Sequence, residues 1–440
     1  MNFDDTIFAL ASGQGRAAIA VIRLSGPGTR EVLAALAGGT PPPRRMALRN
    51  LKNPAGETLD QALVLWMPRP ESFTGEDQAE LHIHGGLAVR AGVVRALSSL
   101  PGCRAAEPGE FTRRAFLNGR MDLAAVEGLA DLIDAETEAQ RRQALRQLGG
   151  MLGRLVDRWR DKLIEILALL EASLDFSDER DVEDAAIDPR SAGMIAGLAE
   201  EMGRHLADGR RGERLREGFS VVLAGPPNAG KSTLLNGLAC REVAIVSEIP
   251  GTTRDAIEVR CDLGGLPVTF IDTAGLRDTD DPIERLGVAR TRAHAAEADL
   301  VLWLVAPDGS GSAADDDIGA TPLLRVGTKA DLGSRAAADV DLRVSALAGH
   351  GMSELLDRIA AIAEGALGDG DAVITRERHR QALEDAQRSL CRASSALQEE
   401  HSELAAEDVR LALRALARVT GRIDLEEVLD RLFASFCIGK

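Results

Sequence analysis

A glycine-rich octapeptide directly follows a short apolar run near the middle of the chain. The run spans residues 219–223, and the octapeptide, residues 225–232, reads GPPNAGKS. This is the G-x-x-x-x-G-K-[ST] spacing that joins a buried strand to a helix and curls backbone N–H groups around phosphates. In that pattern Lys231 reaches the β- and γ-phosphates, and the Ser232 hydroxyl holds Mg²⁺. A simple glycine turn would explain Gly225 and Gly230 but not Lys231-Ser232, so the sequence predicts a nucleoside triphosphate site.

A second motif follows the strand-like run at residues 268–271. That run ends in Asp272-Thr273-Ala274-Gly275. An Asp at the end of a buried strand can orient Mg²⁺ through water, and the Gly275 amide can approach a γ-phosphate where a side chain would clash. Between the two motifs, residues 251–255 read GTTRD and offer the Thr253 hydroxyl as a second Mg²⁺ ligand. Each short motif also occurs by chance, but their order and separation together predict one nucleotide-hydrolysing domain.

The choice of base rests on Thr328-Lys329-Ala330-Asp331, which follows another strand-like run. The Asp331 carboxylate can accept from guanine N1–H and the 2-amino group together, whereas adenine offers neither donor in that arrangement. The Lys329 stem can lie on the base plane, and Ser345-Ala346-Leu347 fits a backbone contact to the guanine carbonyl. The GTPase pattern has Asn where this chain has Thr328, which leaves one tie to the phosphate-binding loop unsupported. We therefore expect weaker guanine binding and no switch to ATP.

Hydrolysis in this chain requires an unusual water-positioning group. Leu276 follows Gly275, where many signalling GTPases carry a Gln that orients the attacking water. Leucine cannot do this, so another group must position the water and another source of positive charge must act on the transition state. Glu284, in the segment DDPIER at 280–285, is a nearby candidate. The same spacing equally fits a Glu284 that caps a helix beginning near Pro282, so the residues alone leave both roles open.

Longer segments, spread from one end of the chain to the other, carry a family pattern. In the middle of the chain they are residues 225–233, 245–255 and 272–277. In the N-terminal part they read DTI at 5–7, GR at 15–16, IRLSG at 22–26, SFTGED at 72–77, PGEFT at 108–112 and AFLN at 115–118. The chain ends in FCIGK at 436–440, a highly specific pentapeptide. Together these segments resemble the tRNA-modification GTPases of the MnmE (TrmE) family, and the chain is identified as a member.

The resemblance implies a potassium-dependent GTPase whose two G domains meet across a homodimer. It places K⁺ where other GTPases use an arginine finger, with the ligands Asn228, Ser247, Ile249 and Thr252. It assigns Mg²⁺ to Ser232 and Thr253, catalysis to Lys231, and water positioning to Glu284. The GTP contacts expected here are Asn228, Ala229, Gly230, Lys231, Ser232, Thr233, Ser247, Glu248, Ile249, Pro250, Gly251, Thr252, Thr253, Asp272, Thr273, Ala274, Gly275, Thr328, Lys329, Ala330, Asp331, Ser345, Ala346 and Leu347.

A second chemical site is implied in the N-terminal domain. Proteins of the family bind 5-formyl- or 5,10-methylene-tetrahydrofolate there as a one-carbon donor, and the matching residues are Arg23, Glu80, Arg120 and Lys440. Arg23 and Lys440 suit the glutamate-tail carboxylates of the folate, while Glu80 can accept from N–H donors of the pterin. The family typically has Lys at the place of Arg120, and a guanidinium keeps the charge but changes the geometry.

The resemblance also implies a reaction that needs a partner. A flavin-bearing protein of the MnmG (GidA) type would help to install a carboxymethylaminomethyl or aminomethyl group at C5 of the tRNA wobble uridine, position 34. Glycine or ammonium would supply the amine, and GTP hydrolysis would drive the conformational cycle. The sequence has no dinucleotide fingerprint with a downstream acidic residue, so the flavin must come from the partner. Cys437 either acts as a nucleophile or acid/base group near the folate, or lies buried as an inert thiol.

Changes of periodicity divide the chain into four stretches. They are residues 1–118, 119–217, 218–366 and 367–440. The first predicts an α+β domain, which the resemblance makes the folate-binding and dimerisation domain, with strand-like runs at 19–24, 62–67 and 79–83 and a helix at 30–36. The second and fourth have the 3.6-residue period of amphipathic helices and flank an α/β P-loop (Ras-like) G domain. One bundle interrupted by an insertion and two separate bundles both fit the residues, and the resemblance favours one bundle.

The composition is acidic, with a net charge of −17 and a pI near 5.0. A protein that coats nucleic acid is usually basic, so contact with tRNA must be confined to a local patch or dominated by a partner. The candidate patches are Arg113, Arg114 and Arg120, or Arg141, Arg142, Arg146 and Arg154, and solvated helix faces are the favoured interpretation of both. With no long apolar run, an acidic N-terminus and five cysteines without metal spacing, we expect a reduced cytoplasmic protein without a membrane span.

Two further interpretations are weaker. His82 and His84 lie two residues apart on one expected strand face, as in a metal pair, but no third ligand is evident. A ribosome-assembly GTPase, acting as an RNA-binding switch, would share the G motifs. Such proteins usually carry a basic RNA-binding domain, and this acidic chain has no KH-like G-x-x-G module in basic context. The FCIGK ending would also be unexplained in that class, so the tRNA-modification enzyme is favoured.

Overall fold

The computed structural model describes residues 4–13, 15–177, 189–208, 210–226, 228–241, 243–245, 257–272, 297–308, 321–332, 340–368, 371–423, 426–434, 436 and 439. Predicted site residues at positions 247–253, 273–275, 284, 437 and 440 lie outside these ranges. The chain divides into two compact units. The first comprises Met1–Ala130, Leu148–Arg158 and Arg414–Lys440, and the second comprises Asp131–Gln147 and Trp159–Leu413.

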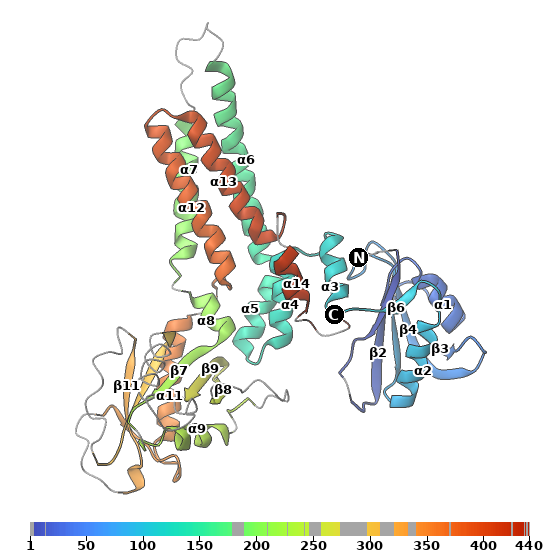
Figure 1. Cartoon of the computed structure of the whole chain (residues 1–440), viewed down its shortest axis with the longest axis horizontal. Helices are drawn as coiled ribbons and strands as arrows, with labels where there is room; N and C mark the ends of the chain where they lie inside the picture. The colour runs from blue at the N-terminus through green and yellow to red at the C-terminus, as the bar shows by residue number, and fades with distance from the viewer. Residues whose placement is uncertain are drawn as a thin grey trace, which may run out of the picture. The chain divides into compact units, whose positions relative to one another are not determined.

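The first unit contains a six-stranded sheet, drawn in blue in Figure 1. Its strands, in order across the sheet, are β3 (Ala47–Lys52), β4 (Thr58–Met67), β5 (Gln78–His84), β2 (Ile19–Ser25), β1 (Thr6–Leu10) and β6 (Cys103–Ala105). Neighbouring strands are antiparallel, except for the parallel pair β1 and β6. Helices α1 (Thr29–Ala37) and α2 (Leu87–Ser98) contribute Leu33 and Leu97 to a core with Leu81 of β5. Because side chains alternate along a strand, Glu80 and His82 lie on the opposite face of β5.

A buried ion network ties the N-terminal segment to α3 (Glu110–Leu117). The guanidinium of Arg114 is fully buried and donates to Asp5 at 2.7 Å, to Glu110 at 3.0 Å and to Glu76 at 3.2 Å. Burial alone would raise the pKa of Asp5, but hydrogen bonds from Arg104 and Arg114 outweigh it and lower that pKa. Arg114 is therefore a structural cation, and both interpretations of it, as part of a tRNA-binding patch and as part of a solvated helix face, are wrong.

The second unit holds the nucleotide motifs in another six-stranded sheet. Its order is β12 (Leu342–Arg343), β11 (Leu323–Gly327), β10 (Leu300–Val305), β7 (Phe219–Ala224), β9 (Leu266–Asp272) and β8 (Ile257–Leu263). The sheet is parallel except for the edge strand β8, which is antiparallel to β9. Helices α9 (Lys231–Ala239) and α11 (Met352–Leu367) bury Leu235 and Ile359 with Phe270 of β9. The carboxyl ends of parallel strands share one edge, so the loops after β7, β9 and β11 meet there.

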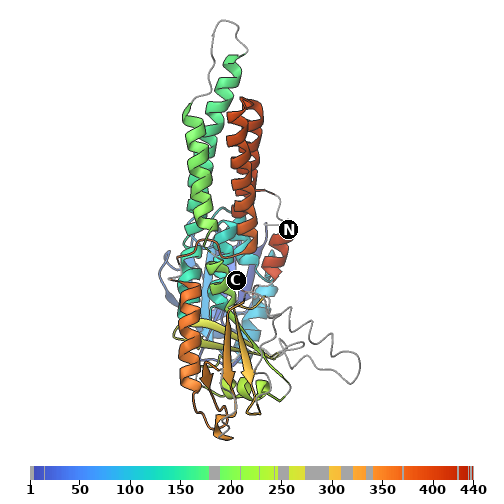
Figure 2. The same ribbon diagram turned by 90° about the vertical axis from the view of Figure 1, so that its left-hand side faces the viewer.

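Four long helices form a bundle within the described part of the second unit, as Figures 1 and 2 show. They are α7 (Pro189–Leu206), α12 (Glu377–Gln398) and the parts of α6 (Met151–Ser177) and α13 (Ser402–Thr420) that belong to this unit. Trp159, Leu163, Ile166 and Leu170 are fully buried along α6, which confirms the predicted 3.6-residue period. The other α-helices among the described residues of the whole chain are α4 (Leu123–Asp134), α5 (Glu138–Leu148), α8 (Arg211–Glu217) and α14 (Glu426–Ala434). No helix in the described ranges is long and apolar enough to cross a bilayer.

The two chain connections of the second sheet run beside each other. Gly212, in α8 before β7, lies so close to the Ile374 carbonyl, after α11, that no side chain would fit. Arg380, at the start of α12, is 5% exposed and binds Glu213 at 3.0 Å and Asp208 at 3.1 Å. The entry to and the exit from the G domain are thus fastened to each other. This confirms the predicted architecture, in which an α/β P-loop domain is inserted into helical segments.

Candidate functional site

The phosphate-binding loop leaves the carboxyl end of β7 and ends at the first turn of α9. Gly225 has a φ of +133°, and a Cβ there would lie 2.6 Å from the Leu304 carbonyl oxygen, so the turn requires glycine. Gly230, with a φ of +94°, occupies the N-cap of α9. The free N–H groups and the dipole of a helix N-terminus favour an anion. The described part of the loop therefore has the geometry of a phosphate site.

Three polar side chains meet at this loop. The ammonium of Lys231 donates to the carbonyls of Gly225 at 2.8 Å and Pro226 at 3.0 Å, positions from which it can turn to phosphate oxygens. The Ser232 hydroxyl donates to Asp272 at 2.8 Å, and Asp272 is fully buried at the end of β9. Hydroxyl and carboxylate oxygens are the hard ligands that suit Mg²⁺. The structure thus brings Ser232 and Asp272, two residues expected near Mg²⁺, together at the phosphate-binding loop.

The loops after β11 and β12 bring the predicted base-binding residues together. A hydrogen bond from the side chain of Ser345 lowers the pKa of Asp331 below its ordinary value, and Asp331 is exposed. The Asp331 carboxylate is therefore ionised and available to accept from a base. Ala346 lies against Gly237 of α9, whereas Leu347 is 85% exposed. Loops far apart in sequence thus converge on the end of the sheet that carries the phosphate-binding loop.

Thr328 forms a hydrogen bond to the phosphate-binding loop, a contact for which the sequence lacks the usual Asn. Its hydroxyl donates to the Ala229 carbonyl at 2.7 Å and lies 3.2 Å from the Val305 carbonyl, and the residue is 9% exposed. Beside it, the ammonium of Lys329 donates to the Asn228 carbonyl at 3.0 Å. A hydroxyl therefore fastens this loop to the phosphate-binding loop in place of the usual amide. The expected weakening of guanine binding stays a prediction.

Thr328→Val tests this tie, because it removes the hydroxyl at nearly constant volume and leaves the Ala229 carbonyl without its donor. We expect the Kd for GDP to rise about fivefold, the usual effect of losing one buried hydrogen bond. Thr328→Ser keeps the hydroxyl and is the matched control, with a Kd close to that of the original protein. Titration with fluorescent GDP measures all three proteins. A Kd for Thr328→Val equal to the original would show that the tie does not position the loop.

A second polar site lies on the outer face of the first sheet. Arg23 of β2 and Glu80 of β5 face each other in the strand register, with 3.3 Å between the guanidinium and the carboxylate. The other oxygen of Glu80 lies 3.2 Å from Nε2 of His82. These three side chains are 19–24% exposed. Glu80 is thus held from both sides while it remains open to a ligand.

Two aromatic rings hold Arg23 in place. Its guanidinium carbon lies 5.6 Å from the ring centre of Phe73 and 5.9 Å from that of Phe111, within the range of cation–π attraction. The Nε of Arg23 is buried and has no hydrogen-bond partner among the described residues. A buried donor without an acceptor is costly, and a ligand or ordered water that accepts from it would remove this cost.

Arg120 and the C-terminal tail approach the same neighbourhood within the first unit. Arg120 packs on Gly75, in the loop that also carries Phe73, and a Cβ at Gly75 would lie 3.3 Å from its Cγ. Gly439 is buried against the backbone of Leu10, which follows the strand residue paired with Arg23. The structure thus brings Arg23, Glu80 and Arg120 toward one loop and strand end. Lys440 follows Gly439 in sequence but lies outside the described residues.

The sequence alone did not reveal the roles of His82, Phe73 and Phe111. His82 was paired with His84 as a weak metal candidate, but its partner is Glu80, whereas His84 lies 2.7 Å from Asp60. No group of three or more potential metal-binding side chains occurs among the described residues. The spacing of Glu80 and His82, two residues apart on one strand face, was the available signal for their contact.

The second predicted basic patch is also partly neutralised. Arg141 and Arg142 share Glu138 at 2.7 and 2.8 Å. Arg146 lies 2.7 Å from Asp371. These contacts support the interpretation that these three arginines belong to a solvated helix face.

Comparisons with known proteins agree along the whole chain. Residues 123–437 match the model of the MnmE helical domain, and residues 6–120 match that of the N-terminus of the GTP-binding protein TrmE. The tRNA modification GTPase MnmE of Methylobacterium sp. (strain 4-46) is 64% identical over 99% of this chain and 100% of that relative. Those of Methylorubrum populi and Methylobacterium radiotolerans are 61% and 60% identical, over 99% and 100% of this chain and 98% and 100% of the relatives. The chain therefore belongs to the MnmE family of tRNA-modification GTPases.

Proposed function

We propose that this GTPase acts with a flavin-bearing partner of the MnmG (GidA) type on the wobble uridine of tRNA, position 34. The product would be 5-carboxymethylaminomethyl or 5-aminomethyl uridine, with a tetrahydrofolate as one-carbon donor and glycine or ammonium as the source of the amine. One observation carries this proposal beyond a GTP-driven switch. The chain has a second polar site, built around Arg23 and Glu80, in a different compact unit from the G sheet, and Gly439 of the C-terminal tail packs on the backbone of Leu10 in that unit.

The chemistry of this second site suits a folate. A folate carries carboxylates at one end and N–H donors on its pterin at the other. Because Arg23 lies 3.3 Å from Glu80, these two residues would bind the same end of the folate, and the glutamate tail would need the other cations. The Nε of Arg23, which has no hydrogen-bond partner in the part of the chain that the structure describes, is a donor available to a ligand, and Glu80 is an acceptor fixed by two neighbours. Arg120 would add a second cation, and Lys440 a third. Cys437 would be the acid/base or nucleophilic candidate beside them.

The G-domain residues suit the two metal ions of the proposed activity. Ser232, bonded to Asp272, would hold Mg²⁺ together with Thr253. Asn228 is exposed on the phosphate-binding loop, and its side-chain oxygen is a ligand of the kind that K⁺ takes. Ser247, Ile249 and Thr252 would complete that site. The K⁺ would supply positive charge to the phosphates during hydrolysis when the G domains of a homodimer meet, with Glu284 positioning the water.

A chromatographic census of wobble nucleosides tests the proposed function. In a strain lacking this protein, the C5-modified wobble uridine should disappear, and the intact gene should restore it. The purified Glu80→Gln protein should still hydrolyse GTP, because Glu80 lies outside the G domain. The gene that encodes this variant should not restore the modified nucleoside in the strain. Normal modification together with stalled ribosomal precursors would overturn the proposal in favour of a ribosome-assembly GTPase.

A further inference from the structure

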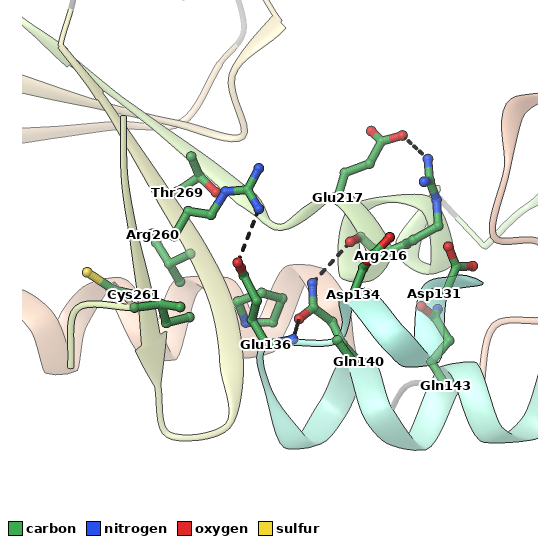
Figure 3. A pocket seen from close by; sticks show the side chains of 14 residues that line it. Asp131, Asp134, Glu136, Gln140, Gln143, Arg216, Glu217, Arg260, Cys261 and Thr269 are labelled. Atoms are coloured by element: carbon green, nitrogen blue, oxygen red, sulfur yellow. Dashed lines mark hydrogen bonds and ion pairs between the residues drawn. The ribbon is translucent and has the colours of Figure 1, made fainter. Parts of the chain in front are cut away.

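Helix α5 contacts the G sheet although it lies outside the nucleotide motifs in sequence. The backbone N–H of Ala139 donates to the Gly265 carbonyl at 3.2 Å, in the turn between β8 and β9. Just before α5, the Glu136 carboxylate lies 3.3 Å from the Arg260 guanidinium on β8, as Figure 3 shows. The β8–β9 hairpin is therefore held by a hydrogen bond at its turn and by an ion pair on its edge strand.

Glutamines attach the same helix to α8. Gln140 caps the start of α5 by accepting from the N–H of Glu136 at 3.0 Å, and its amide donates to the Arg216 carbonyl at 3.0 Å. One turn later, Gln143 is 4% exposed and donates to the Gly212 carbonyl at 3.0 Å. Arg216 lies three residues before the first residue of β7. The start of α5 thus touches the segments that lead into both β7 and β9.

The contact is polar and incompletely packed. Its residues line a cavity of about 280 Å³, in which Figure 3 shows Asp134, Glu217 and Thr269 beside Gln140 and Arg260. A polar cavity of this size has room for water molecules that bridge polar groups. The Arg260 side chain is 55% exposed and that of Glu136 is 25% exposed. This ion pair can therefore form or break without opening the apolar core beneath it.

The two strands that begin at this contact end at the phosphate-binding loop and at Asp272. They are parallel neighbours, with Phe219 opposite Val268 at their start and Leu223 opposite Asp272 at their end. β7 continues into the phosphate-binding loop, and Asp272 ends β9 and accepts from Ser232. Paired strands shift as rigid elements, so a displacement at one end is felt at the other.

We infer that α5 is a positioning element of the GTPase site: through Glu136, Ala139 and Gln140 it sets the relative position of β7 and β9, and it senses the nucleotide at their far ends. Coupling between two sites is reciprocal, so a contact that favours one nucleotide state is itself changed by that state. Only Gly149 and Gly150 separate α5 from α6, so a nucleotide-dependent change in α5 would pass along the chain into α6. The inference rests on the GTPase activity alone and does not depend on the folate or wobble-uridine chemistry.

Hydrogen exchange of the full-length protein tests the inference. We expect the amides of α5 to exchange at rates that differ at least about fivefold between the GDP form and the form with a non-hydrolysable GTP analogue, the lower range of allosteric couplings. Glu136→Gln should reduce this difference to less than about twofold and should change the ratio of the two nucleotide affinities correspondingly. The double variant Glu136→Arg with Arg260→Glu reverses the ion pair and should restore both quantities.

Glu138→Gln is the matched control, because it removes one negative charge only two residues along the chain from Glu136. Hydrogen bonds from Arg141 and Arg142 lower the pKa of Glu138 to about 2, and both partners lie on α5 itself. This variant should keep the nucleotide-dependent difference. Equal exchange of α5 in both nucleotide forms of the original protein would overturn the inference. An effect of Glu138→Gln as large as that of Glu136→Gln, or a reversed pair that fails to restore the coupling, would assign the change to helix stability and would equally overturn it.

Discussion

Glu284→Ala should lower kcat for GTP hydrolysis at least about a hundredfold, the usual loss for a positioned water-orienting group, while nucleotide affinity stays close to the original. The reason is that Leu276 cannot orient water, and the family resemblance assigns this role to Glu284. Steady-state hydrolysis in K⁺ and titration with GDP measure the two quantities separately. Asp281→Ala is the control, because an acidic residue at the start of a helix near Pro282 would share any capping role. Hydrolysis by Glu284→Ala at the original rate would show that Glu284 does not position the water, and capping of a helix would remain as its role.

The same assay in Na⁺ addresses the source of positive charge. If Asn228 and the segment 247–252 hold K⁺ in place of an arginine finger, the original protein should hydrolyse GTP far more slowly in Na⁺. The Glu284→Ala protein should be slow in both salts. Equal rates of the original protein in K⁺ and Na⁺ would remove the potassium assignment without affecting that of Glu284.

The phosphate-binding loop was predictable because its backbone tolerates few residues. A Cβ at Gly225 would clash with the Leu304 carbonyl, so this turn requires glycine, and the glycine in the motif therefore predicts the turn. The pairing of Ser232 with Asp272 follows from the shared edge of parallel strands. The contact made by Thr328 was not predictable in this way. A motif compares residue types and does not show that the hydroxyl of a side chain shorter than Asn reaches the same loop.

The N-terminal domain was predictable only in part. Alternating patterns located β2, β4 and β5, because a strand with one buried face repeats every two residues. The buried Arg114 was misplaced on the surface because its partner Asp5 is 109 residues away, and a charge in sequence does not reveal such a partner. The contacts of α5 left no pattern either, since Gln140 and Gln143 bind backbone carbonyls, which every residue carries.

Deletion of residues 437–440 should abolish binding of 5-formyltetrahydrofolate and modification of tRNA. The described part of the tail is tied to the first unit: Phe436 is 6% exposed and lies 6.1 Å from Phe433 between ring centres. Gly439 is buried beside Leu10 and Ala11, at the end of the strand that pairs with the strand of Arg23. A chain end fixed in this way loses the ordinary tendency of termini to fray, and it would hold Lys440 near the proposed folate site.

Calorimetry with 5-formyltetrahydrofolate measures the loss directly, and basal GTP hydrolysis is the internal control. Hydrolysis should remain close to that of the intact protein, because the expected GTP contacts lie between residues 228 and 347 and Glu284 is within that range. The point variant Lys440→Ala keeps the buried glycine and removes only one cation, so it separates the charge from the docking of the tail. If it weakens folate binding as the deletion does, the ammonium is the binding group. Undiminished folate binding by the deletion protein would mean that the tail serves the flavoprotein or the tRNA, and the assignment of Lys440 would be wrong.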